Sequence, residues 1–355
     1  MRAVKRSLLR LFKRFLQHPS VRAELDSHFL LRHIHLPHIQ NRPAPYIDLS
    51  SVRESPTDVG SRPPPVFITS RFRSGSTLLW NLFRQIKGCT AYYEPFNERQ
   101  WFNPTLRGVR VDDSHVGVSD YWREYEGLEE LAQWYQPRWI DESLYMTERS
   151  WDPAMVRYIE LLVERASNRA VLQFNRVDFR LAWLRHYFPQ AVIVHLYRHP
   201  REQWLSFLRD KREMNALDVD RTYRDSFYLD SWCADLRCQF PFLERDATPH
   251  PYRRFYYLWK LSFLHGQHYA HTSLSFEELV STPEDTMTRL LHDVDWTTAV
   301  DVPALSALVE APRLDRWRDY ADAGWFAAHE EACEAVLAYH LDSASAAQSA
   351  RPPGG

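Results

Sequence analysis

The chain has 355 residues, of which 45% are hydrophobic, and its formal net charge is −2. This length and apolar content suit one large domain with its own buried core. The nearly neutral charge argues against nucleic acid as a partner, although it leaves room for a local basic pocket. The four cysteines are too few and too scattered for a disulfide framework, and no cysteine–histidine spacing is typical of a zinc site. We therefore expect reduced thiols, a cytoplasmic location and no metal.

Residues 1–40 begin with a basic amphipathic segment. Over residues 1–16, apolar side chains recur at helical spacing, and basic side chains fill the other positions without any acidic residue. Such a helix could lie peripherally on the anionic inner surface of a membrane, or it could pack its apolar stripe on the domain or on a partner. No run in the sequence approaches the roughly 18 apolar residues that a membrane span needs.

Proline-rich and small-residue stretches divide the chain. Residues 41–64 are rich in proline, which resists regular structure, and we interpret them as a linker. Residues 342–355 are small, polar and rich in proline and glycine near the end, so we expect a disordered tail. The functional domain is accordingly expected to span residues 65–341.

The domain opens with a strand, a loop and a helix. Val66–Thr69 is a short apolar run, and Thr77–Gln85 then shows helical spacing of its apolar residues. A second unit begins at Ala191–Tyr197, whose nearly continuous apolar character is typical of a buried parallel strand. Pro200 follows, and it suits the first turn of the next helix because its missing N–H would have no partner there anyway.

A third strand is expected at His271–Phe276. Thr282 and Pro283 follow it as the N-cap and first residue of another helix. Strands that alternate with helices predict an α/β fold, with a P-loop-type parallel sheet flanked by helices on both faces and with helical insertions.

The segment Ser70–Thr77, SRFRSGST, joins the first strand to its helix. Backbone N–H groups and the helix dipole at such a junction form an anion site, and Gly75 lets the backbone approach a phosphate closely. Compared with the nucleotide-triphosphatase pattern GxxxxGK(S/T), Gly75 and Thr77 fit, but Ser76 replaces the lysine. The missing lysine, with a cation offered instead by Arg73, suits a donor that has one 5′-phosphate with a group attached to it.

The stretch VFITSRFRSGSTLLWNLF resembles the 5′-phosphosulfate-binding loop of the PAPS-dependent sulfotransferase family, in the form seen in carbohydrate-type members. VIVHLYRHPREQWLSFLRD resembles the same family's 3′-phosphate segment, in which an arginine at a strand end and a serine eight residues later hold the phosphate. Arg198 and Ser206 match that spacing, and Arg198 leaves the carboxyl end of a strand, where ligands bind in open α/β sheets. Looser resemblances are LQFNRVDFRLAWLRHYFPQ, Phe276–Leu279 and Arg316–Arg318.

The resemblance implies transfer of a sulfuryl group from 3′-phosphoadenosine 5′-phosphosulfate (PAPS), a co-substrate, to a hydroxyl acceptor such as a glycan or a small molecule, without a metal. An in-line attack of this kind depends mainly on positioning and on stabilising the charge of the leaving phosphate, to which Arg73 would contribute. The donor-binding residues implied by the resemblance are Arg73, Ser74, Gly75, Ser76, Thr77, Arg198, Ser206 and Arg318.

The acceptor hydroxyl needs a general base. Residues 91–98, AYYEPFNE, resemble the Tyr-Glu-Pro segment of carbohydrate-type sulfotransferases, whose members often use a glutamate, and this makes Glu94 the candidate. Glu94 could instead be structural and pair with Arg71 or Arg73, and Glu98 is the reserve candidate. No histidine clearly matches the base of the family's small-molecule branch.

A tryptophan-rich insertion follows between Glu98 and Pro153. We expect it to cover the active site, with most of its aromatic residues in a core. Two other functions stay open: a P-loop nucleotide kinase or triphosphatase, which the missing lysine disfavours, and a catalytically silent binding protein. The acceptor and the oligomeric state cannot be read from the sequence.

Overall fold

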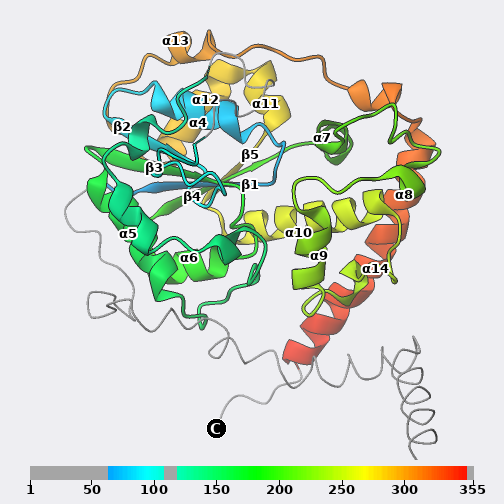
Figure 1. Cartoon of the computed structure of the whole chain (residues 1–355). Helices are drawn as coiled ribbons and strands as arrows, with labels where there is room; N and C mark the ends of the chain where they lie inside the picture. The colour runs from blue at the N-terminus through cyan, green and yellow to red at the C-terminus, as the bar shows by residue number, and fades with distance from the viewer. Residues whose placement is uncertain (1–62, 108–117, 350–355) are drawn as a thin grey trace, which may run out of the picture.

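A parallel five-stranded sheet forms the centre of the protein, in a computed structural model that describes residues 63–107 and 118–349. The strand order is β2-β3-β1-β4-β5. Helices lie on both sides of the sheet, with α4, α11 and α12 on one side and α5 and α6 on the other (Figure 1). The expected α/β fold is therefore confirmed. The strands are β1 (Val66–Ser70), β2 (Cys89–Tyr93), β3 (Arg169–Phe174), β4 (Val192–Tyr197) and β5 (Thr272–Ser275).

The helices connect and surround these strands. The α-helices are α4 (Ser76–Arg84), α5 (Pro153–Arg165), α6 (Leu181–Tyr187), α7 (Pro200–Phe207), α8 (Val219–Thr222), α9 (Leu229–Leu236), α10 (Pro251–Tyr269), α11 (Phe276–Ser281), α12 (Pro283–Asp293), α13 (Val302–Ser306) and α14 (Ala323–Ser349). Short 3-10 helices are η1 (Arg123–Tyr125), η2 (Glu129–Gln133), η3 (Pro137–Ile140), η4 (Pro241–Leu243) and η5 (Arg316–Asp319).

The three predicted strand-and-helix units are present. Their strands are β1, β4 and β5, and Pro200 and Pro283 stand in the first turns of α7 and α12, as expected. Thr282 is the N-cap of α12, but its side chain makes no capping hydrogen bond. A full capping box stands one helix earlier, where Ser275 and Glu278 satisfy each other's backbone N–H groups at the start of α11.

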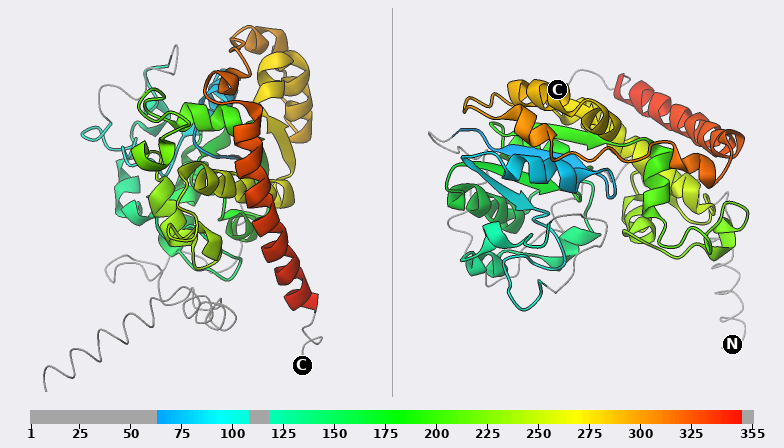
Figure 2. Two further views of the ribbon diagram at one scale, coloured as in Figure 1. Left: turned by 90° about the vertical axis from the view of Figure 1, so that its right-hand side faces the viewer. Right: turned by 90° about the horizontal axis from the view of Figure 1, so that it is seen from above.

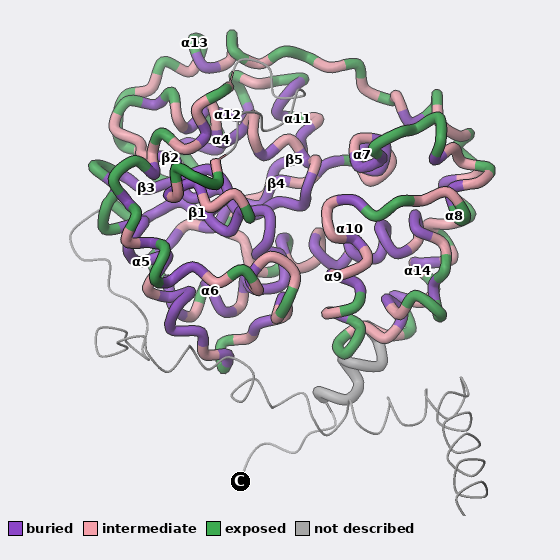
Figure 3. Tube along the Cα trace, in the orientation of Figure 1, coloured by how far each residue is buried: buried purple, intermediate pink, exposed green. Residues whose placement is uncertain are grey.

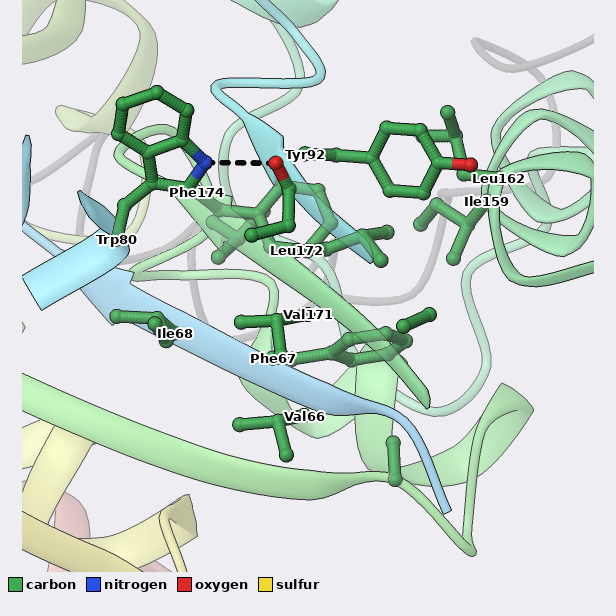
Figure 4. Close-up of a cluster of buried hydrophobic side chains, with 14 of the residues drawn as sticks. Val66, Phe67, Ile68, Trp80, Tyr92, Ile159, Leu162, Val171, Leu172 and Phe174 are labelled. Carbon is green, nitrogen blue, oxygen red and sulfur yellow. Dashed lines mark hydrogen bonds between the residues drawn. The ribbon is translucent and has the colours of Figure 1, made fainter. Parts of the chain in front are cut away.

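The main hydrophobic core lies on both faces of the sheet. Val66, Phe67 and Ile68 of β1 are almost completely buried, because β1 is the middle strand and pairs with both β3 and β4. Figure 4 shows them beside β3 residues and Trp80 of α4. The Trp80 indole N–H donates to the Ala91 carbonyl at 2.8 Å, which fixes α4 against β2.

A second hydrophobic cluster lies beside the sheet, among α7, α9, α10 and α14. Figures 1 and 2 show this group of helices, with α14 running along its outside. The buried residues in Figure 3 accordingly fall into two regions, one around the sheet and one among these helices. In the insertion, Trp101, Trp134 and Trp139 are buried in the first core, in agreement with the expected aromatic packing.

Helix α14 passes the boundary at residue 341 that the sequence analysis gave for the domain. It continues to Ser349. Alanine recurs in this stretch, and it has the highest helix propensity of any residue, which favours continuation of the helix. The amphipathic residues 1–16, most of the proline-rich stretch and the last six residues lie outside the described residues. In the described ranges, no helix has both the length and the apolar character that crossing a bilayer requires.

Candidate functional site

The loop between β1 and α4 turns sharply back over the end of β1. Arg73 and Gly75 have positive φ angles of 67° and 90°, which glycine adopts readily and arginine rarely. Ser74 between them is buried, and its hydroxyl donates to the Arg71 carbonyl at 2.7 Å. Helix α4 starts at Ser76, so its first N–H groups lie at the end of the loop. Unpaired N–H groups at a helix N-terminus are the kind of groups that bind anions.

An aromatic ring closes one side of this loop. A Cβ atom added at Gly75 would lie 2.2 Å from Cδ2 of Phe276, the first residue of α11. The same ring lies under the Arg198 guanidinium, 4.6 Å from its Cζ. Phe276 therefore packs against both phosphate-binding segments that the sequence suggested.

Those two segments contact each other directly. Arg73 donates through Nε to the hydroxyl and to the carbonyl of Ser206, each at 3.0 Å. Arg198 donates through Nη1 to the Arg73 carbonyl at 3.2 Å. The contact arises because β1 and β4 are parallel neighbours, with Ser70 opposite Leu196, so that both carboxyl ends reach the same edge of the sheet.

A buried carboxylate links Arg198 to the C-terminal basic stretch. Glu202 Oε2 lies 3.4 Å from Arg198 Nη2 and 3.4 Å from Arg316 Nε. Glu202 Oε1 accepts from the backbone N–H of Trp317 at 3.1 Å. Burial lowers the pKa of Arg198 to about 10, although the Glu202 charge opposes this effect.

Further positive charge surrounds this cluster. Burial, followed by the charge of Arg316, lowers the pKa of the Lys211 ammonium, and Arg198 and Arg73 act in the same direction. The four cations therefore lie near enough to repel one another, with Glu202 as a partial counter-charge. Such an arrangement favours a bound anion.

Arg318, the predicted donor-binding residue of this stretch, points elsewhere. It is exposed, and its Cζ lies 4.5 Å from the centroid of the Trp317 ring. Residues 316–319 form the 3-10 helix η5, in which residues two apart project from different sides. Arg316, and not Arg318, consequently reaches Glu202.

The remaining loop residues extend the site toward β2. Ser76 is buried at the first position of α4, and the Thr77 hydroxyl lies 3.0 Å from the Tyr93 hydroxyl at the end of β2. Glu94 follows Tyr93 directly, with a φ of 39°. The structure thus brings Glu94 to the same edge of the sheet as the loop.

Glu94 is buried in a polar network. Its Oε1 accepts from Asn175 Nδ2 at 2.6 Å, and its Oε2 accepts from Arg176 Nη1 at 3.2 Å and from Asn97 Nδ2. The expected structural partner Arg71 instead pairs with Asp178, at 3.5 Å. The ion pair of Glu94 is therefore with Arg176, and the suggested pairing with Arg71 is wrong.

Arg176 is a central residue of the site that sequence reasoning missed. It donates through Nη2 to Glu98 Oε2 at 2.7 Å, and its Cζ lies 5.0 Å from the Phe72 ring and 5.6 Å from the Tyr228 ring. Burial lowers the pKa of Arg176, but the Glu94 and Glu98 charges outweigh burial and raise it overall. A signal was present, because Arg176 comes two residues after the end of a buried strand.

Two consecutive aromatic residues cover the loop. Phe227 and Tyr228 have φ angles of 49° and 62°, and their rings lie 5.8 and 5.9 Å from the Phe72 ring. The Arg73 guanidinium lies 5.6 Å from the Phe227 ring. Strained backbone of this kind persists where surrounding contacts hold it, and it concentrates at functional sites. In the described ranges, no group of three or more His, Cys, Asp or Glu side chains is arranged to hold a metal ion.

The chain as a whole resembles known proteins. The model of the family described as "Sulfotransferase family" matches residues 64–299. The comparison with curated proteins gave no match. Similar solved structures include sulfotransferase STF9 from Mycobacterium avium, at 13% identity, covering 79% of this chain and 76% of that chain with a TM-score of 0.40.

Two further structures are similar. The sulfotransferase domain from the Synechococcus PCC 7002 olefin synthase is 18% identical, and the match covers 81% of this chain and 96% of that chain with a TM-score of 0.39. Mouse sulfotransferase SULT7A1 complexed with PAP is 10% identical, with coverage of 79% and 90% and a TM-score of 0.33.

Proposed function

The chain belongs to the sulfotransferase family, and from this premise we propose that it transfers a sulfuryl group from PAPS to a hydroxyl acceptor. The observation that carries the choice of donor is the meeting of Arg73, Ser206 and Arg198 at one edge of the sheet. Two segments far apart in sequence form a single basic site there, and a nucleotide with a phosphate at each end would contact both.

The basic cluster suits the 3′-phosphate of the donor. Arg198 and Ser206 would bind this phosphate, and Arg316 and Lys211 would add positive charge. Glu202 offsets part of that charge in the absence of a ligand. An arginine guanidinium offers a phosphate both a positive charge and directed hydrogen bonds, and a serine hydroxyl offers a further hydrogen bond.

The loop suits the 5′-phosphosulfate. The N–H groups at the start of α4 and the side chains of Arg73, Ser76 and Thr77 would stabilise the negative charge on the leaving 5′-phosphate. A serine at position 76, in place of the lysine that reaches β- and γ-phosphates, disfavours a nucleoside triphosphate.

In the proposed reaction the acceptor oxygen attacks sulfur in line with the bond to the 5′-phosphate. A carboxylate, Glu94 or Glu98, takes the hydroxyl proton. The acceptor class that we propose is a glycan or a small molecule. The proposed location is the cytoplasm, where the four thiols, which are free in the structure, would stay reduced, and peripheral membrane contact through residues 1–16 is a further proposal.

Calorimetric titration with 3′-phosphoadenosine 5′-phosphate (PAP), without metal, tests the donor site. We expect micromolar binding by the wild type and at least about 10-fold weaker binding by Arg73→Ala and by Arg198→Ala, because each removes a charged hydrogen-bond donor. Arg169→Ala is the matched control, since Arg169 is also buried but lies at the amino-terminal end of β3.

Correctly folded wild type that does not bind PAP, or that binds ATP only together with Mg²⁺, would overturn the proposal. Equal PAP affinity in all four proteins would exclude the basic cluster as the donor site.

A further inference from the structure

Two carboxylates share one buried guanidinium beside the donor loop. Arg176 donates through Nη1 to Glu94 and through Nη2 to Glu98, at 3.2 and 2.7 Å. The Arg176 side chain is 2% exposed. The two glutamates differ strongly in their surroundings, and this difference separates their roles.

Glu94 has its oxygens directed inward. Asn175 donates to Oε1, while Arg176 and Asn97 donate to Oε2. The residue is 8% exposed, and a turn in which the Asn97 N–H donates to the Glu94 carbonyl at 2.9 Å fixes its backbone. A general base must reach the acceptor hydroxyl within hydrogen-bond distance. Glu94 has each carboxylate oxygen engaged by side chains of the protein and is poorly accessible to an acceptor.

The Glu98 side chain is partly exposed to solvent. Its exposed fraction is 48%, and the contact with Arg176 engages Oε2. Tyr228 also makes a side-chain hydrogen bond with this carboxylate, and burial, followed by the Glu98 charge, raises the pKa of that phenol to about 12, so Tyr228 stays neutral. Glu98 can therefore meet an acceptor from solvent while the protein holds it from behind.

The same contacts connect Glu98 with the donor loop. The Arg176 guanidinium lies over Phe72, the residue before Arg73, and the Tyr228 ring also packs against Phe72. One end of this cluster is thus the donor loop, and the other end is the exposed carboxylate of Glu98.

We infer that Glu98 is the catalytic base of the sulfuryl transfer, that Arg176 is a positioning residue for it, and that Glu94 anchors Arg176. This inference rests on the proposed function. The acceptor O–H bond breaks and its proton passes to a carboxylate oxygen of Glu98. The acceptor oxygen forms a bond to sulfur, and the bond between sulfur and the bridging oxygen breaks with its electron pair moving onto the 5′-phosphate. Sulfated acceptor and PAP leave, and Glu98 releases the proton to water.

The test compares Glu98→Gln, Glu94→Gln and Arg176→Lys with Glu164→Gln. Glu164 is the matched control, because it is also an exposed, arginine-paired glutamate, 2.9 Å from Arg157, but it lies on α5 outside the site. Formation of PAP from radiolabelled PAPS is followed with water alone and with para-nitrophenol or para-nitrophenyl N-acetylglucosaminide as acceptor. Thermal unfolding and PAP affinity are measured for every protein.

Glu98→Gln should lower the rate of PAP formation about 100-fold, the usual contribution of a general base, with PAP affinity unchanged. Its unfolding midpoint should fall less than that of Glu94→Gln, because the Glu98 carboxylate is 48% exposed and a partly exposed charge contributes modestly. Glu94→Gln should mainly lower the unfolding midpoint, by about 5 °C, because it removes one of the two charges that neutralise Arg176. Arg176→Lys should lower kcat more than it raises KM for PAPS, since lysine lacks the fork that holds both carboxylates. Glu164→Gln should resemble the wild type.

Wild-type rates in Glu98→Gln would overturn the assignment, and so would a 100-fold loss confined to Glu94→Gln without a loss of stability. Wild type that binds PAP but does not accelerate PAP formation with water or with either acceptor would also contradict it. Failure of the proposed function is distinguishable from these results, because it appears as a loss of PAP binding in the wild type itself.

Discussion

The guanidinium of Arg73 donates through Nε to the hydroxyl of Ser206, 3.0 Å away, and this hydrogen bond joins the loop after β1 to the helix after β4. Arg73 reaches Ser206 with a positive φ of 67°, which directs its side chain across the carboxyl edge of the sheet. The bond orders a loop side chain before any ligand arrives, so less conformational entropy is lost on binding.

Ser206→Ala should weaken PAP binding about 10-fold, because it removes a hydrogen-bond donor to the 3′-phosphate and frees the Arg73 side chain. Binding of 5′-AMP, which lacks the 3′-phosphate, should weaken less, because only the ordering of Arg73 is lost. Calorimetry with both nucleotides measures the effect as a ratio of affinities. A parallel loss for PAP and 5′-AMP would show that Ser206 does not contact the 3′-phosphate.

Gly75→Ala should abolish PAP binding and lower the free energy of unfolding by about 3 kcal/mol, because the new Cβ would overlap Phe276 and the positive φ disfavours alanine. Gly88→Ala separates these causes, since Gly88 has a φ of 85° with nothing within 4 Å of a Cβ atom. Gly88→Ala should lower the free energy of unfolding by only about 1 kcal/mol and leave PAP binding intact. Urea unfolding and calorimetry provide both quantities, and equal costs at the two positions would contradict the overlap with Phe276.

Arg316→Ala and Arg318→Ala should have different effects on PAP affinity, although the two positions are only two residues apart. Arg316 contacts Glu202, the partner of Arg198, whereas Arg318 lies exposed over the Trp317 ring. Arg316→Ala should weaken PAP binding about 5-fold and Arg318→Ala less than about 2-fold, because a partly exposed charge contributes modestly. The measurement is PAP affinity at low and moderate salt, and the opposite ranking would assign the contact to Arg318.

His195 should make the protein less stable in mild acid. Burial lowers the pKa of this imidazole from its usual 6.5 to about 4. The unfolded chain therefore binds a proton that the folded protein does not bind, so stability is present above 6.5 and is lost as the pH falls toward 4. Between pH 7.5 and 5 this histidine alone should lower the free energy of unfolding by about 2 kcal/mol. Urea unfolding of the wild type and of His195→Asn at both pH values tests this, and an equal pH dependence in the two proteins would refute it.

Much of the framework could be predicted from local sequence. β1 and β4 are largely apolar runs, and Pro200 and Pro283 mark helix starts, so the alternation of strands and helices could be predicted. Strands β2 and β3 were not assigned as such from their residues, CTAYY and RAVLQF. Such short runs resemble segments of buried helix, and their pairing with distant neighbours decides their structure.

The loop after β1 and the segment after β4 could be recognised from the sequence, because in each of them a strand, a turn and a helix start are consecutive in the chain. Which residues surround these two segments depends on the packing of the domain. β1 and β2 are consecutive in the chain, but β3 lies between them in the sheet. This order brings Arg176, just after β3, into contact with both Glu94 and Phe72. Likewise, the turn of η5 selects Arg316 over Arg318 as the partner of Glu202. These contacts depend on strand order and side-chain direction, which arise from packing of the whole domain and not from the spacing of residues along the chain.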